Sequence, residues 1–154
     1  MNTNKEPSTL KSHIGYQLRL ISNAVSHSFA KKLAIHEVTV AEWVILREMS
    51  TKNENISSSM IAEFTGLTRG AVSKLVERLV NKNLITRSES KIDRRYHDVK
   101  LTIESTELVP ILAAIADEND QLFFAELSST EQKTLMNILI KLSETHKLNT
   151  NPIK

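Results

Sequence analysis

The sequence TRGAVSKLVERLVNKNLITRSESKIDRRYHDVKLT, residues 68–102, decides the fold, because it joins a capped amphipathic helix to a strand pattern. The hydroxyl of Thr68 can accept a hydrogen bond from a backbone N–H of the first turn, which predicts that a helix begins there and extends to Asn81. At about 100° per residue, the apolar side chains of this helix fall on one stripe. The stripe predicted to face the core consists of Val72, Leu75, Val76 and Leu79.

The opposite face of this helix is polar. It carries Gly70, Ser73, Lys74 and Glu77, with Thr68 and Arg69 in the first turn and Arg78 at the flank. A glycine lets a phosphate backbone or a base edge come close, and Arg, Lys and Ser side chains donate hydrogen bonds to both. Such a face is suited to binding in a groove of DNA. The simpler alternative is a helix face that meets only solvent, because most amphipathic helices bind nothing.

The residues after the helix favour a DNA-binding face. Asn83 suits the left-handed conformation that ends a helix, so Leu84-Ile85 should begin a strand. Residues 98–103 alternate polar and apolar side chains, with Val99, Leu101 and Ile103 on the expected buried face of a second strand. The two strands predict a β-hairpin directly behind the helix.

The loop of this hairpin is polar and basic, and contains Lys91, Arg94 and Arg95. A basic loop on a hairpin can enter a minor groove, where the phosphates favour arginine. We expect Arg95 to insert into the groove and Asp93 to orient that arginine without touching DNA.

These residues resemble the MarR family of transcriptional regulators. The resemblance rests on Ala71-Val72-Ser73-x-Leu75-Val76-x-Arg78-Leu79, Leu84-Ile85, Asp93-x-Arg95 and Leu101-Thr102, and extends through Thr39-Val40-Ala41-Glu42-Trp43-x-x-Leu46 to the C-terminal helices. Asn83 and Ser105 stand where the family often has glycine, which bears on turn geometry. The resemblance implies a winged helix-turn-helix protein that binds double-stranded DNA as a homodimer.

The resemblance also implies a ligand site, since such proteins often bind small aromatic or lipophilic anions between their dimerisation helices and the winged lobe. The candidates for this cleft are His13, Tyr16, Arg19, Trp43 and Arg47. Arg47 could neutralise a carboxylate ligand. The alternative for Trp43 is a packing role, because buried aromatic residues usually serve the core.

The chain has 154 residues, the size of one domain with a proper core, so we expect residues 1–154 to form a single domain. The chain contains no cysteine, which excludes disulfides and thiolate ligands within it. The first ten residues are polar, and no apolar run approaches the length of a membrane span, so we expect a cytoplasmic protein without a membrane partner.

Positive charge is concentrated in one part of the chain. The net charge is +2, but residues 66–100 hold nine Lys and Arg against four acids, a local charge of +5, which leaves −3 for the rest. One lobe should therefore attract DNA while the other repels it.

The remaining sequence is mainly helical, with three glycines and three prolines. Apolar periodicity and polar caps predict further helices at 8–33, 39–50, 57–66, 104–126 and 129–147. Pro110 interrupts one of them and should remove a hydrogen bond. The helix at 57–66 and the one at 68–81 are separated by a short turn, as in a helix-turn-helix.

We therefore expect a mainly α fold, with a winged helix-turn-helix at 36–103, a small β-hairpin wing, and dimerisation helices at 8–33 and 104–148. The outer helices hold more apolar surface than the winged lobe can cover, which favours a dimer. The alternative is a three-helix bundle within one chain.

No enzyme or cofactor is expected, since the sequence lacks a nucleophile elbow, a P-loop and a dinucleotide fingerprint. The five histidines show no metal-binding spacing, and we predict no metal site, although distant residues could converge. The function expected is a ligand-responsive repressor that binds a palindromic operator. The alternatives are a winged-helix protein-interaction module without DNA binding and a metal-responsive regulator.

Overall fold

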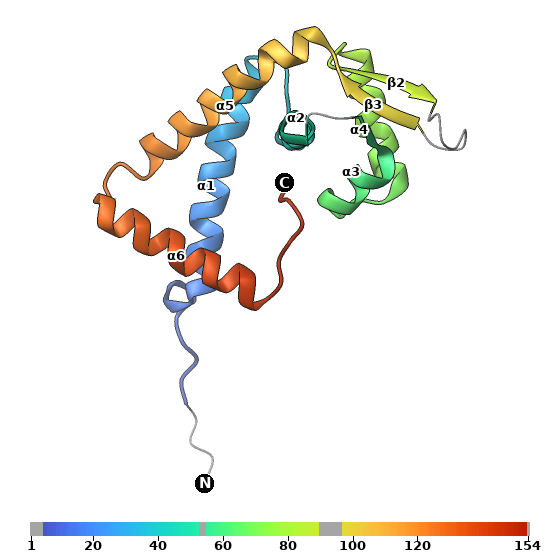
Figure 1. Ribbon diagram of the computed structural model, residues 1–154. Helices are drawn as coiled ribbons and strands as arrows, with labels where there is room; N and C mark the ends of the chain where they lie inside the picture. Colours follow the sequence, from blue (N-terminus) through green and yellow to red (C-terminus); the bar gives the residue numbers. More distant parts are fainter. Residues whose placement is uncertain (1–4, 53–54, 90–96, 154) are drawn as a thin grey trace.

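The computed structural model describes residues 5–52, 55–89 and 97–153 (Figure 1). Its elements are a 3₁₀ turn (Leu10–Ser12), α1 (Ile14–Ala34), α2 (Val40–Lys52), β1 (Ile56–Ser57), α3 (Ser58–Thr65), α4 (Arg69–Asn81), β2 (Ile85–Glu89), β3 (His97–Leu101), α5 (Ile103–Phe123) and α6 (Ser129–Thr145). The predicted mainly α fold with a small β-hairpin is confirmed, and the hairpin belongs to a three-stranded sheet.

Polar caps set the helix starts as predicted. The Thr68 hydroxyl accepts from the Ala71 N–H at 3.2 Å and begins α4, and Ser57 does the same for α3. Thr39 and Glu42 form a reciprocal capping box at the start of α2, with N···O distances of 2.9 and 3.2 Å. These bonds satisfy N–H groups that a helix leaves unpaired in its first turn.

Left-handed residues end two helices and thereby set the turns of the winged lobe. Gly66 ends α3 with φ 71°, and Asn83 follows α4 with φ 59°. Asparagine tolerates this conformation better than most residues with a side chain, so Asn83 can make the turn after α4.

The sheet has three antiparallel strands in the order β1-β3-β2. The hairpin aligns Arg87 with Val99, and on the other side Ile56 of β1 also pairs with Val99. The hairpin agrees with the sequence prediction, whereas β1 was not predicted. Two residues are too few to show an alternating pattern, so only their pairing with β3 identifies them as a strand.

Two predicted boundaries were wrong. Ile103 does not continue the strand: it begins α5 and is 79% exposed, because the Thr102 hydroxyl accepts from the Ser105 N–H and starts a helix there. The first helix begins at Ile14 and not at Ser8, after an extended His13. Leu10 and Ile14 are largely exposed, so no packing holds the preceding residues in the helix.

The core lies in the winged lobe, where α2, α3, α4 and the sheet meet the N-terminal half of α5. Its buried apolar residues include Ile45, Leu46, Met49, Ile56, Ile61, Val72, Val76, Leu79, Ile85, Val99, Val109 and Leu112. α1 and α5 extend side by side from this lobe, and α6 follows at their far end (Figure 1).

The outer helices remain incompletely covered. α6 has no buried residue, and large apolar side chains of α1, α5 and α6 are exposed, among them Leu18, Ile21, Ile111, Leu122, Met136, Ile138, Leu139 and Leu142. α1 packs on α5, where the Ser28 hydroxyl donates to Asn119 Oδ1 at 2.9 Å. Over the described residues, then, the chain does not close a three-helix bundle. Among those same residues, no helix has both the length and the apolar character to cross a bilayer.

Candidate nucleic-acid interface

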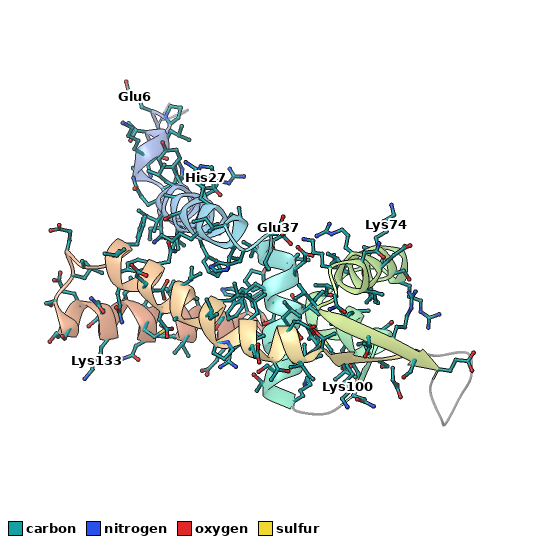
Figure 2. The ribbon with its side chains drawn as sticks, turned by 90° about the horizontal axis from the view of Figure 1, so that it is seen from above. Glu6, His27, Glu37, Lys74, Lys100 and Lys133 are labelled. Carbon is teal, nitrogen blue, oxygen red and sulfur yellow. The ribbon has the colours of Figure 1, made fainter. Side chains whose placement is uncertain are left out.

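The exposed face of α4 is the centre of the candidate interface. Val72, Leu75, Val76 and Leu79 are buried as predicted, which orients the opposite face to solvent. On that face the exposed residues are Thr68, Arg69, Gly70, Ser73, Lys74, Glu77 and Arg78. Lys74 extends away from the body of the protein (Figure 2).

Gly70 leaves a gap in this face. A Cβ built at Gly70 meets no atom within 4 Å, and the residue has ordinary helical geometry. Neither packing nor backbone conformation therefore requires glycine here. The free space above the residue is available to a molecule that approaches α4 closely.

Arg78, which the sequence analysis assigned to DNA, also contacts the protein. Its Nη2 lies 3.7 Å from Glu42 Oε1 and 3.4 Å from Thr39 Oγ1, while half of its side chain stays exposed. If Arg78 contacts DNA, its guanidinium does so while it is oriented by Thr39 and Glu42.

Glu42 makes a contact with Lys82 that the sequence pattern does not predict. Its side chain is completely buried, and Oε1 accepts from the Thr39 N–H and from Lys82 Nζ, each at 2.9 Å. The sequence shows the capping box, but Lys82 is forty positions further along the chain, and no local pattern joins the two residues.

The environment of Glu42 lowers its pKa. Burial acts most strongly and raises the pKa, but the hydrogen bonds from Lys82 and Thr39, with the attraction of the Lys82 charge, together lower it below the ordinary value of 4.5. The carboxylate is therefore ionised at neutral pH in the folded protein.

This shift predicts a pH-dependent contribution to stability. A lowered folded pKa means that the Glu42 carboxylate stabilises the fold above pH 4.5, and that this contribution is lost as the pH falls through the folded pKa. Compared with wild type, Glu42→Gln should lose more free energy of unfolding at neutral pH than at a pH below 4.5, as urea titrations can measure. A deficit that grew on acidification would contradict the assignment.

The wing is described only in its strands. Arg87 of β2 and Lys100 of β3 are exposed, and in Figure 2 Lys100 projects to the side of the lobe opposite Lys74. The predicted wing residues Lys91, Asp93, Arg94 and Arg95 lie outside the described residues.

The five candidates for a ligand site do not come together within one chain. His13, Tyr16 and Arg19 lie at the start of α1, whereas Trp43 packs edge-on against Phe29 at 6.2 Å, with the rings at 84°. Phe29 is thirteen residues beyond Tyr16, about 20 Å along the helix at 1.5 Å per residue. Trp43 is half-buried at the edge of the core, which supports a packing role for this residue.

Trp43 and Arg47 are four residues apart on α2 and so share one helix face. Arg47 is exposed, and Trp43 is half-buried. These two residues are the part of the predicted ligand set that the fold brings together. Over the described residues, no three His, Asp or Glu side chains form a group able to hold a metal ion.

A helix-turn-helix with a β-hairpin wing and a basic, exposed second helix defines a DNA-binding protein of the winged-helix class. Residues 36–95 match the model of the MarR family. A protein of Thauera aromatica described as a regulator of the hcr operon is 26% identical over 134 residues, which cover 87% of this chain and 81% of the relative.

Solved structures agree with these matches. A transcriptional regulator from Pseudomonas aeruginosa superposes with a TM-score of 0.77 at 26% identity, over 87% of this chain and 99% of that one. MepR of S. aureus, solved with DNA, gives 0.77 at 25% identity, over 86% and 98%. The chain is therefore a DNA-binding transcriptional regulator of the MarR type, with its match to the family model over residues 36–95.

Proposed function

We propose that the protein acts as a homodimer that binds a palindromic operator and represses transcription until a small ligand releases it. The observation that carries the proposal is the exposed polar face of α4, with its open space at Gly70. A helix can lie in a major groove only if its backbone can approach the bases, and this face allows that approach.

In this proposal α4 enters the major groove and the wing enters the minor groove. The DNA-contacting residues are Thr68, Arg69, Gly70, Ser73, Lys74 and Arg78 of the helix, and Lys91, Arg94 and Arg95 of the wing, with Asp93 orienting Arg95. The complex of MepR with DNA supports this arrangement, because a relative of the same fold is seen bound to DNA.

The dimer is proposed from the uncovered outer helices. We assign the winged lobe to 36–103 and the dimerisation helices to 8–33 and 104–148. A cavity of about 280 Å³ between α5 and α6 is lined in part by Phe124, Leu135, Met136 and Leu139. Large apolar side chains left exposed together on α1, α5 and α6 are typical of an interface between subunits.

Dimerisation sets the form of the operator. Two recognition helices related by a two-fold axis should contact half-sites about 10 bp apart in an inverted repeat. Duplexes enriched by the protein from a random-sequence library should contain such repeats, and a reporter carrying one next to its promoter should be repressed. Enrichment of no sequence at all would refute the proposed function.

A small aromatic or carboxylate ligand is proposed to bind beside α2, near Trp43 and Arg47. His13, Tyr16 and Arg19 can join this site only from a second chain, given their distance along α1. Trp43 is the one tryptophan of the sequence, so titration with an aromatic acid such as benzoate should change its emission saturably. Release of operator DNA without any change in emission would place the ligand elsewhere.

We predict that Lys74→Ala weakens operator binding by about 1 kcal/mol and lowers the salt slope by about one, as expected for a lost phosphate contact. Lys133→Ala is the matched control, because Lys133 also projects into solvent but from α6 (Figure 2). Binding isotherms at several salt concentrations measure both effects. A salt slope near zero for wild type would favour a protein-interaction module.

A further inference from the structure

The C-terminal end of the recognition helix is fixed by charged groups and not only by apolar packing. Lys82 follows α4 directly, and its Nζ donates to Glu42 Oε1 at 2.9 Å and to the Glu37 carbonyl at 2.7 Å. Glu37 lies in the turn that joins α1 to α2, with φ 58° (Figure 2). One ammonium group thus connects α4, α2 and the end of α1.

Glu42 is the centre of these contacts. It is fully buried on α2, and the guanidinium of Arg78, one turn before Lys82, lies 3.7 Å from the same oxygen. Two cations at the C-terminal end of α4, Arg78 in its last turn and Lys82 just after it, therefore meet one buried carboxylate. We call Thr39, Glu42, Arg78 and Lys82 the anchor cluster.

Only the carboxylate of this ion pair is fully buried, since the Lys82 side chain is 35% exposed, and the cost of removing the Glu42 charge from water offsets much of the attraction. The geometric effect of the pair is stronger, since the carboxylate, the ammonium and the Glu37 carbonyl must meet within hydrogen-bond distance. That requirement permits only a narrow range of positions of the α4 C-terminus on α2. Apolar contacts are non-directional, so the apolar stripe of α4 constrains the orientation of the helix less tightly than these hydrogen bonds do.

We propose that Glu42 is a positioning residue for operator recognition: through Lys82 and Arg78 it holds α4 in the one orientation in which its exposed face meets the bases in register. The inference rests on the proposed function, in which α4 contacts the operator. Base contacts need that register, whereas non-specific binding depends mainly on phosphate charge and does not.

The test uses Glu42→Gln, which removes the charge while its amide oxygen can still accept from the Thr39 N–H. Charge alone predicts tighter DNA binding, because a negative group is lost. If Glu42 orients α4, the variant should instead bind an enriched duplex about tenfold more weakly and bind a shuffled duplex with unchanged affinity. Glu63→Gln, at an exposed site of α3, removes the same charge without breaking a buried contact and is the matched control.

A second variant separates positioning from stability. In Glu42→Gln/Lys82→Met the Lys82 ammonium, whose side chain is 35% exposed, is removed together with the carboxylate that it pairs with, so stability should recover toward wild type. Under the proposal, affinity for the enriched duplex stays about tenfold low while thermal unfolding recovers. This variant also decides the question if Glu42→Gln alone does not fold.

The outcomes are distinct. Recovery of both affinity and stability in the double variant would show a structural role only and overturn the inference, as would a Glu42→Gln protein that binds the enriched duplex like Glu63→Gln. If the wild-type protein enriches no duplex from the library, the proposed function itself fails.

Discussion

Gly70→Gln should weaken operator binding strongly while it makes the protein more stable. Glutamine favours a helix over glycine by about 0.5–1 kcal/mol, and a Cβ at position 70 meets no atom within 4 Å, so the fold has room for the side chain. A DNA backbone or base edge against α4 would have to occupy the same space. We expect affinity to fall by roughly 100-fold, or about 2.7 kcal/mol.

Gly15→Gln is the matched control for this substitution. Gly15 is the second residue of α1, as Gly70 is of α4, and its Cβ position is equally open. Both variants should unfold at a temperature equal to or above that of wild type. Only Gly70→Gln should fail in gel-shift titrations. Equal DNA affinity in the two variants would remove α4 from the interface.

Leu139→Asp should convert the proposed dimer to a monomer. Leu139 lines the cavity between α5 and α6 and is 40% exposed in the single chain, so a charge there harms a subunit interface more than the chain's own core. Burying an unpaired carboxylate costs several kcal/mol. Light scattering should give the 17.4 kDa mass of one chain for the variant and twice that mass for wild type.

Operator affinity should fall with the dimer, because two linked recognition helices gain on the order of 100-fold or more over a single one. Asn137→Asp adds the same charge two positions away, on another side of α6, and should leave both the mass and the affinity unchanged. A wild-type protein that scatters as a monomer, or a Leu139→Asp protein that stays dimeric, would contradict this interface.

Local chemistry explains what the sequence determined by itself. Thr68 and Ser57 cap their helices through bonds that span three residues, and Gly66 and Asn83 end helices by their own tolerance of positive φ. The buried stripe of α4 follows from helix periodicity alone. These local signals therefore predict the helix-turn-helix, the hairpin and the exposed face of α4 without any knowledge of tertiary contacts.

Contacts between distant residues decided the rest. β1 is a strand only because Ile56 pairs with Val99. The Glu42–Lys82 hydrogen bond joins residues 40 positions apart, and no periodic pattern in the sequence connects them. Likewise, only packing shows that Trp43 lies against Phe29, far along α1 from Tyr16. A sequence pattern indicates which face of a helix or strand is apolar. Which residues pack against that face, or pair with a buried charge, depends on the tertiary structure of the whole chain.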